Sequence, residues 1–404
     1  MNMQANPPAE APTNGVRSAT VEPLPFVLKD RTLVAKRVST VDTAPFKLPD
    51  VRDYLARLLT LQDPKDPIES LDRVRVSFAG RHMTAKLLKH NGFGRPMLFS
   101  ANGASQMARM VLPSRFFSGL RELALMDEQG ERLATDVWAK FASAKDKERM
   151  VRTVRMKVGD TVYRVVRSCH STGYAPYSNL AFTTDLIEHA GIYSNLPVLG
   201  WHVTDAAMRL RFAGIDDALE VLRHWDAGAL ADEPIPMVEC WNSEVGRRKV
   251  GLRGGLFKLD SGGCIPHWDP RREWSWIHRG DPERIQKSVQ AAFKDLLLAA
   301  QAVVNAYKES MNVDIDDVFA WLVSELRRMK SSDRLIATAK GKLDAATPVG
   351  RAGTLSAAVD SLTLAALEEK DIFQQYEVER LAAQVLKRGL DHARTHDCKI
   401  VVGV

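Results

Sequence analysis

A stretch near the middle of the chain combines positive charge with turn-forming residues. Residues 240–263, CWNSEVGRRKVGLRGGLFKLDSGG, contain five cations and two anions. Arg247, Arg248 and Lys249 follow a glycine, at a position that predicts the turn of a hairpin. Guanidinium and ammonium groups on such a turn can bind phosphate. The pattern is also compatible with an ordinary solvated hairpin in which Glu244 pairs with a neighbouring arginine.

A second basic segment lies earlier in the chain. Residues 145–167 contain eight cations and three anions, in two runs rich in β-branched residues around Gly159 and Asp160. Successive residues of a strand point to opposite faces, and these cations occupy both parities. They therefore do not form one flat basic wall. We still expect at least four of them to line a positive groove.

Aromatic residues are interleaved with both basic segments. Tyr174 and Tyr177 lie in a turn with Gly and Pro and are expected to be exposed, whereas Trp241 and Phe257 lie in apolar strands and are expected to be buried. Base stacking combined with phosphate neutralisation is typical of single-strand binding. The predicted nucleic-acid-binding residues are Arg152, Arg155, Lys157, Arg164, Arg167, Tyr174, Tyr177, Arg247, Arg248, Lys249 and Arg253.

The tryptophan-rich segment 260–280 offers possible metal ligands. Asp260, Cys264, His267 and Asp269 could gather around an ion, but their spacing matches no standard site. No metal is therefore predicted. We expect the segment to pack beneath the C-terminal helices, with a partner-binding surface as the alternative.

No motif for catalysis or for a cofactor is present. Cys169 and His170 are adjacent in a strand and so point to opposite faces, which discourages a nucleophile pair. Phosphate-loop, nucleophile-elbow, zinc-protease and dinucleotide fingerprints are lacking. The sequence therefore favours binding over catalysis and predicts neither catalytic residues nor cofactors. A metal-dependent nucleic-acid enzyme that uses scattered carboxylates remains a further alternative; the carboxylates are Asp205, Glu239 and Glu244.

These residues must be positioned by strands and helices. The sequence pattern of those segments predicts an α+β fold with a mixed, mainly antiparallel sheet and helical insertions. Strand pairs are predicted in the ranges 149–168, 196–214 and 235–259, beside a strand at 73–78. Helices are predicted at 48–61, at 102–123 with a break at Pro113, at 131–143, and at 179–191 with Asn179 as its cap. From residue 281 onward all further elements are expected to be helical.

Composition divides the chain of 404 residues into three regions. Residues 1–45 are rich in Pro, Ala and Thr and predict a flexible arm. Residues 46–280 predict the α+β core domain, and residues 281–404 the helical C-terminal region. The whole is 45% hydrophobic and 26% charged, as is usual for soluble globular proteins.

Charge and cysteine usage limit the setting of the protein. The net charge of +6 permits binding to polyanions but does not demonstrate it. The cysteines, Cys169, Cys240, Cys264 and Cys398, form no close pair and are expected to be free thiols. Neither a long apolar run nor a signal-peptide pattern is present, so we expect no membrane association and a location in the cytoplasm of the host cell.

Three segments between about residue 98 and residue 265 form a recognisable series: SQMARMVLPSRFFSGLREL, YRVVRSCHSTGYAPYSNLAFTTDLIEHAG and WNSEVGRRKVGLRGGLFKL. In sequence, order and spacing they resemble a phage and plasmid family, the domain of unknown function 932. The chain departs from the pattern after the third segment, with Asp-Ser-Gly-Gly-Cys where members often have a Cys-x-Asn-Gly turn. The resemblance implies an origin in a bacteriophage, prophage or plasmid and no established activity.

The resulting hypothesis is a phage- or plasmid-type protein that binds nucleic acid, foremost single-stranded DNA, in replication, recombination or strand annealing. The alternative is an interaction protein without catalytic activity that binds a host or phage protein. A homo-oligomer is compatible with either hypothesis.

Overall fold

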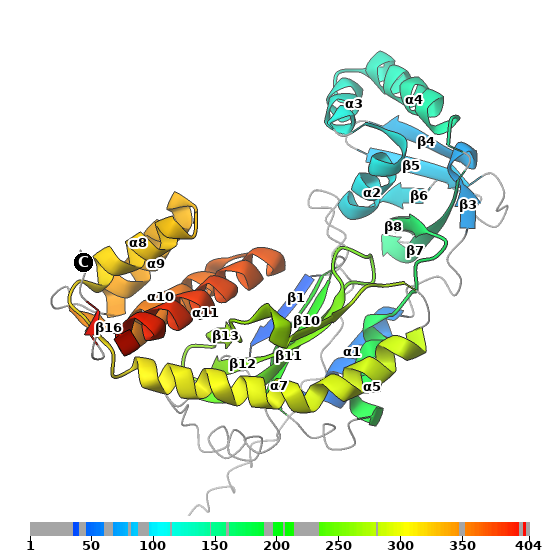
Figure 1. Ribbon diagram of the computed structural model, residues 1–404. Coiled ribbons are helices and arrows are strands. Elements are labelled where there is room, and N and C mark those ends of the chain that lie inside the picture. The colour runs from blue at the N-terminus through cyan, green and yellow to red at the C-terminus, as the bar shows by residue number, and fades with distance from the viewer. Residues whose placement is uncertain are drawn as a thin grey trace, which may run out of the picture.

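The protein has the predicted α+β architecture (Figure 1). The computed structural model describes residues 35–39, 46–59, 68–79, 82–87, 97–113, 115–145, 147–158, 161–189, 197–204, 207–213, 234–279, 282–346, 352–395 and 399–400. Within these ranges its sheets are mainly antiparallel. The parallel pairs are β6 (Met97–Phe99) with β8 (Thr161–Ser171), and β15 (Asp314–Ile315) with β17 (Lys399–Ile400).

One sheet and three helices form an upper lobe (Figure 1). The strand order is β3-β7-β8-β6-β5-β4, and the remaining strands are β3 (Ile68–Ser70), β7 (Glu148–Val158), β5 (His82–Leu87) and β4 (Val74–Ala79). The hairpin predicted at 149–168 is confirmed, since Val158 pairs with Thr161. The core of the upper lobe includes Trp138 and Cys169. The helices are α2 (Ala101–Val111), α3 (Phe116–Ala124) and α4 (Glu128–Ala142), so the chain breaks around Pro113 as predicted.

A second, eight-stranded sheet forms the body of the molecule. Its main path is β1-β9-β10-β11-β12-β13, with β2 beside β9 and β14 beside β12. The strand pairs predicted at 196–214 and 235–259 are confirmed as β9–β10 and β11–β12. The strands are β1 (Ala35–Ser39), β2 (Phe46–Lys47), β9 (Pro197–Thr204), β10 (Met208–Ala213), β11 (Pro234–Asn242), β12 (Val250–Lys258), β13 (Cys264–Pro266) and β14 (Glu273–Trp276).

The predicted N-terminal arm overlaps this sheet. Strand β1 lies within the range expected to be flexible, yet it pairs along its length with β9. Backbone pairing can order a segment that has few large apolar side chains, so Ala35–Ser39 form part of the body sheet. Residues 1–34 and 40–45 lie outside the described residues.

The two faces of the body sheet differ in chemistry because side chains alternate along each strand. One face carries Met208, Leu210, Val238 and Leu252, packed against three helices. The opposite face carries charged residues and lies under α11 (Ile372–Thr395). The helices on the apolar face are α1 (Leu48–Leu59), α5 (Asn179–His189) and α7 (Pro282–Ser310).

The N-terminal cap of α5 differs from the prediction. Ser178 rather than Asn179 caps the helix, because the Ser178 hydroxyl accepts from the Ala181 N–H at 2.9 Å. Asn179 is instead the first helical residue, and its backbone N–H points at a carboxylate of the site described below. The shift of one residue therefore gives Asn179 a role in joining α5 to its neighbours.

The C-terminal region is helical and shares a core with the body sheet. Ile265 of β13 belongs to the same apolar cluster as Trp321 and Leu386. A small sheet of two-residue strands, β16-β15-β17, departs from the all-helical prediction.

No helix among the described residues is both long and apolar enough to span a membrane. The elements not yet given are α8 (Val318–Arg328), α9 (Asp333–Ala346), β16 (Gly353–Thr354) and α10 (Leu355–Glu368).

Candidate nucleic-acid interface

Residues 243–249 connect β11 to β12 and are called the basic loop below. The Ser243 hydroxyl accepts from the Arg247 N–H at 2.9 Å, and the Gly246 N–H donates to the Ser243 carbonyl at 3.0 Å. Gly246 has a φ of +66°, and a Cβ there would lie 2.7 Å from Cε1 of His170. Only glycine combines this left-handed backbone with the close approach to a ring. The turn predicted between the two strands is therefore fixed by Gly246.

The first half of the basic loop is fastened to the upper lobe and to α5. Carboxylate oxygens of Glu244 bind Nη1 of Arg167 at 3.0 Å and accept from the Asn179 N–H at 2.6 Å. Nη1 of Arg152 donates to the Glu244 carbonyl at 2.5 Å, and Nε2 of Gln106 to the Val245 carbonyl at 2.7 Å. The loop is thus anchored by residues far apart in the sequence.

Glu244 is held in its charged form. Burial alone would raise the pKa of this carboxyl, but the charges of Arg167 and Arg152 and the N–H of Asn179 together lower it. The carboxylate and the two arginines are all buried. Glu244, Arg152 and Arg167 therefore join two lobes, and they do not form a surface for a ligand.

Two histidines stack on Tyr174 beside the basic loop. The centroid of the Tyr174 ring lies 3.9 Å from that of His170 and 5.2 Å from that of His278. The tyrosine hydroxyl lies 3.2 Å from the Ser243 carbonyl and 3.1 Å from the Glu244 carbonyl, to either of which it can donate. Tyr174 is only partly exposed, so the ring predicted to stack on bases is already engaged within the protein.

Both histidines are neutral at physiological pH. Burial, with smaller contributions from Arg152 and His278, lowers the pKa of His170 to about 3, and burial together with Arg152 lowers that of His278 to about 4. Nε2 of His170 lies 2.9 Å from the Ser168 hydroxyl. Neither ring nitrogen of His278 forms a hydrogen bond of full geometry among the described residues, although the side chain is buried; its interaction with the Ala175 backbone raises the pKa against the effect of burial.

The second half of the basic loop contacts α11. The guanidinium carbon of Arg248 lies 4.1 Å from the ring centroid of Tyr376 and 4.7 Å from that of Phe373. Arg248 also pairs with Glu377 at 3.5 Å, and Arg247 lies over Phe373 at 5.7 Å. These cation–π contacts orient the two arginines, while Arg247 itself is exposed.

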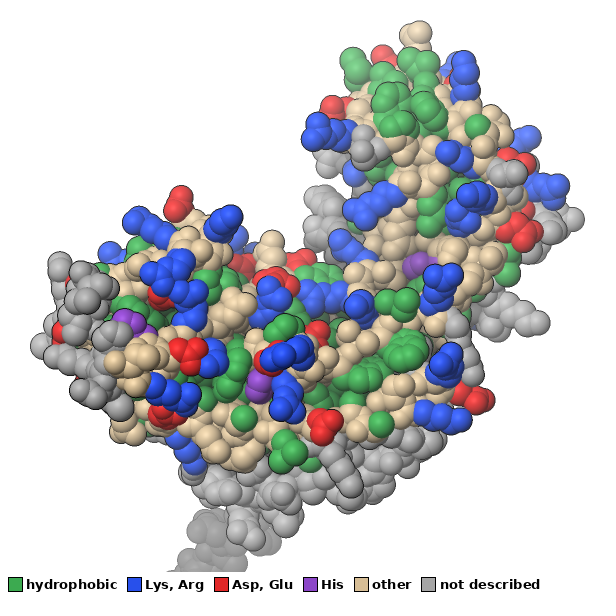
Figure 2. Space-filling model, in the orientation of Figure 1, with side chains coloured by type: hydrophobic (Ala, Val, Ile, Leu, Met, Phe, Trp, Pro, Cys, Tyr) green, Lys and Arg blue, Asp and Glu red, His purple; other side chains and the backbone are tan. Residues whose placement is uncertain are grey.

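A pocket of about 580 Å³ opens beside the basic loop. Among the described residues that line it are four cations and one carboxylate, Glu273, whose oxygen accepts from the Tyr376 hydroxyl at 2.7 Å. On the face shown in Figure 2, Lys and Arg side chains gather where the two lobes meet. The lining residues are Tyr174, Trp241, Gly246, Arg247, Arg248, Lys249, Glu273, Ser275, Ile277, His278 and Arg279.

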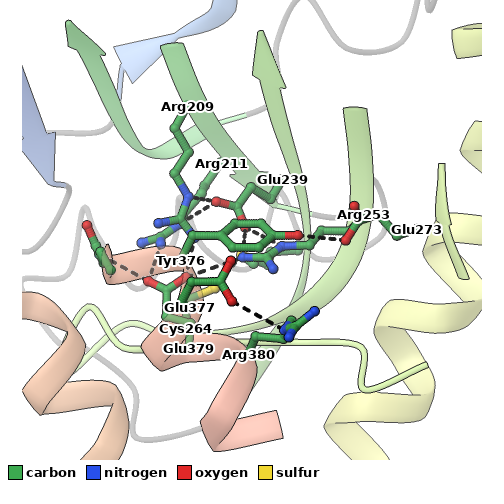
Figure 3. Close-up of polar contacts among 12 residues, drawn as sticks. Arg209, Arg211, Glu239, Arg253, Cys264, Glu273, Tyr376, Glu377, Glu379 and Arg380 are labelled. Atoms are coloured by element: carbon green, nitrogen blue, oxygen red, sulfur yellow. Dashed lines mark hydrogen bonds and ion pairs between the residues drawn. The ribbon is translucent and has the colours of Figure 1, made fainter. Parts of the chain in front are cut away.

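The charged face of the body sheet, shown in Figure 3, shares Glu273 with the lining of this pocket. Arg211, Glu239, Arg253 and Glu273 are direct neighbours across β10, β11, β12 and β14, so their charges alternate. Nε of Arg253 lies 2.7 Å from a Glu239 oxygen. Each arginine in this row therefore has a glutamate as its neighbour on an adjacent strand.

Glu379 of α11 closes the charged face. It pairs with Arg209, with Arg211 at 2.5 Å and with Arg253 at 3.3 Å. Burial would raise the pKa of Glu379, but the three guanidinium groups outweigh it and hold the pKa at about 2. The buried arginines of the charged face are therefore compensated by Glu239 and Glu379.

One group of side chains has the spacing of a metal site. Ligand atoms of Glu239, Cys264 and Glu379 lie within 4.8 Å of one another. Both carboxylates are already bound by arginines, and burial raises the pKa of the Cys264 thiol. Three guanidinium groups in this space repel a cation, so the residues do not fit a metal ion. Asp269, considered as a ligand from the sequence, instead pairs with Arg271 at 2.8 Å.

The structure brings part of the predicted binding set together. Tyr174, Arg247, Arg248 and Lys249 line the pocket. Arg155 and Arg164 face each other across β7 and β8 in the upper lobe, away from the pocket lining. The side chain of Lys157 lies outside the described residues.

Four predicted site residues are buried, and the exposure expected for one of them, Tyr177, was wrong. Arg152 and Arg167 bind Glu244, and Arg253 binds Glu239 and Glu379. Tyr177, expected in an exposed turn, is 4% exposed, and its hydroxyl donates to Asp185 at 2.5 Å. In each case a distant partner satisfies the polar group inside the protein. The burial predicted for Trp241 and Phe257 is confirmed.

The remaining sequence expectations have mixed outcomes. Cys169 packs in the upper core while His170 stacks on Tyr174, as their opposite orientations predicted. Glu239 and Glu244, suggested as scattered catalytic carboxylates, are both held by arginines, and Asp205 lies outside the described residues. In the tryptophan-rich segment, the prediction of packing beneath the C-terminal helices is confirmed: Trp268 packs on the core of the C-terminal region, and Trp274 and Trp276 pack on the apolar cluster that the body sheet shares with α7.

The sequence reasoning missed His278 and Arg279, which line the pocket, and the α11 residues Tyr376 and Glu379. The last two are three residues apart and so share a helix face, which was a detectable signal. Searches of protein-family models, of curated proteins and of solved structures find no match to this chain. The resemblance of residues 98–265 to a phage and plasmid family therefore stays a prediction.

Proposed function

We propose that the protein binds single-stranded nucleic acid, foremost DNA, in the pocket beside the basic loop. The observation that carries the proposal is the excess of positive charge at that pocket. Arg247, Lys249 and Arg279 are exposed there, and the one lining carboxylate among the described residues is bonded to Tyr376. An uncompensated cluster of this kind attracts phosphate groups and releases their counterions.

The shape of the site supports a single strand over a duplex. A volume of about 580 Å³ is in the range of pockets that enclose small ligands. A flexible strand can turn one unit into such a pocket, whereas a base-paired duplex presents only its outer backbone. Two sides of the pocket come from different parts of the fold, since Tyr174 follows the upper lobe and Ser275 belongs to β14.

The setting of the proposed function comes from the sequence. The resemblance to a phage and plasmid family agrees with a role in replication, recombination or strand annealing in the cytoplasm of a host cell. Annealing requires a protein to hold one strand while its bases remain available to another. Binding by cations, with most bases left outside the protein, meets that requirement.

The proposal is tested by fluorescence anisotropy with oligonucleotides over a salt series. The triple variant Arg247→Gln, Lys249→Gln and Arg279→Gln removes the exposed cations but leaves the stacking of Arg248 intact. If each contacts one phosphate, the slope of log K against log salt should fall by about 2 for a single strand. Absence of binding at low salt, or an unchanged slope, contradicts the proposal.

A matched control removes the same charge elsewhere. Arg327, Lys340 and Lys370 are exposed on or beside the C-terminal helices and do not line the pocket. Their triple substitution by Gln changes the net charge equally. The salt slope should stay within error of the original protein, because only the placement of charge differs. An equal loss in the control would indicate non-specific attraction instead of a site.

A second candidate function, binding of a protein partner, is favoured by exposed apolar side chains on the upper lobe. Phe116, Leu125, Met126 and Leu133 are between 43% and 76% exposed. Figure 2 shows hydrophobic side chains at the tip of this lobe, where Figure 1 places α3 and α4. Co-purification of a stoichiometric protein from nuclease-treated host extract, lost on Met126→Gln with Leu133→Gln, would support it.

A further inference from the structure

The pocket beside the basic loop has two chemically different parts. Arg247, Lys249 and Arg279 supply charge and are exposed. His278 and Trp241 are buried and line the same pocket without adding charge. A ligand that satisfies both parts must carry an anionic group and an uncharged, flat, polar group. A free phosphate matches only the first part.

His278 identifies the polar group more closely. A neutral imidazole offers one hydrogen-bond donor and one acceptor, and neither nitrogen of His278 forms a hydrogen bond of full geometry among the described residues, although the ring also contacts the Ala175 backbone. A buried polar group left in this state costs free energy, so a ligand that supplies both partners gains affinity. Nucleobases carry donors and acceptors side by side on their edges. Phosphate oxygens can only accept when fully ionised.

We infer that the pocket holds one unstacked nucleotide, with the edge of its base against His278 and its phosphate at the exposed cations. This inference rests on the proposed function and adds that a base enters the protein. Enzymes and binding proteins that read a single base likewise remove it from the stack and hydrogen-bond its edge. The remaining bases of the strand stay outside the pocket.

The test compares two strands of equal length, one with bases and one with deoxyribose phosphate alone. The original protein should bind the strand with bases about tenfold more tightly, which corresponds to one or two net hydrogen bonds. His278→Phe keeps a ring but lacks both nitrogens, so it should bind the two strands equally. Its affinity for the strand without bases should stay within about twofold of the original, since the cations are untouched.

A second variant separates hydrogen bonding from packing. His278→Gln retains a donor and an acceptor and should keep part of the preference for bases, whereas a purely structural role predicts the same loss in both variants. Thermal melting establishes that each variant is folded. Equal affinity of the original protein for both strands overturns the inference.

Mononucleotides separate this inference from the proposed function. Deoxynucleoside 5′-monophosphates, with inorganic phosphate as the comparison, should shift the NMR signals of the His278 ring. If no strand binds but a monophosphate shifts them, the proposed function fails and the pocket inference stands. If strands bind but no monophosphate shifts the NMR signals of the His278 ring, the inference fails and strand binding by the cations stands.

Discussion

Two arginines five residues apart in one hairpin have opposite surroundings. Arg253 of β12 is 2% exposed and binds Glu239 and Glu379, whereas Arg248 of the basic loop is partly exposed and lines the pocket. Their sequence neighbourhoods are equally basic. The difference shows that a run of cations indicates a ligand only where the fold leaves the charge without enough carboxylates nearby.

The partner of each arginine explains the difference. On the charged face of the body sheet, alternate cross-strand neighbours are glutamates, and α11 adds Glu379 from above. Removing such charges from water is costly, so each needs a close partner. The pocket side of the loop has aromatic rings, Glu273 hydrogen-bonded to Tyr376, and the exposed Glu377 at 3.5 Å from Arg248, while Arg247 and Lys249 remain exposed to solvent.

The largest expected effect concerns the charged face. Glu379→Gln would leave three buried guanidinium groups with the carboxylate of Glu239 alone, and we expect the free energy of unfolding to fall by about 3–5 kcal/mol. Urea denaturation measures the change. Glu377→Gln, on the same helix but exposed and 3.5 Å from Arg248, should cost less than about 1 kcal/mol. Similar losses for both variants would remove the distinction between the two regions.

The second-largest expected effect is a loss of folding stability at acidic pH, caused by the two histidines beside the pocket. The pKa values of His170 and His278 are lowered from 6.5 to about 3 and about 4, so below pH 6.5 the unfolded chain binds more protons than the folded one. Stability is therefore complete above pH 6.5 and falls as the pH drops toward 4, by about 2–4 kcal/mol between pH 6.5 and pH 5. Chemical denaturation across this range checks it, and His278→Phe should reduce the slope by about half. A slope that is unchanged in this variant would contradict the assignment.

The smallest expected effect is the contribution of the exposed cations to the free energy of unfolding. The triple variant at Arg247, Lys249 and Arg279 that reduces nucleic-acid binding should change the free energy of unfolding by less than about 1 kcal/mol, because solvated charges contribute little to folding. Thermal and urea unfolding of this variant, beside Glu379→Gln, place the two regions on one scale. A loss above 2 kcal/mol would mean that the rim cations are structural as well.

Much of the fold follows from local patterns. The hairpin at 149–168 was predicted from β-branched runs around Gly159 and Asp160, and the break between α2 and α3 from Pro113. The charged face was also visible in principle, since Arg209 and Arg211 alternate with apolar residues at the period of a strand. Local pattern therefore predicts which side chains share a face.

The candidate site was harder to predict because its contacts are distant in the sequence. Arg209 meets Glu379, 170 residues later, and no local pattern indicates that pairing. Tyr174 and Tyr177 occupy one turn, yet one lines the pocket and the other bonds Asp185 in the interior. Which cations stay free depends on where α11 and the upper lobe pack, and that is decided by the whole core.

The basic loop is secured at its beginning by Arg152 and Arg167 and at its end by Phe373 and Tyr376. An expression fragment that lacks either the upper lobe or the last long helix would release one side of the loop, even if the rest still folds. Fragments truncated at the borders of the lobes should therefore contain helices and strands but no organised pocket. Any piece meant to keep the pocket has to retain both.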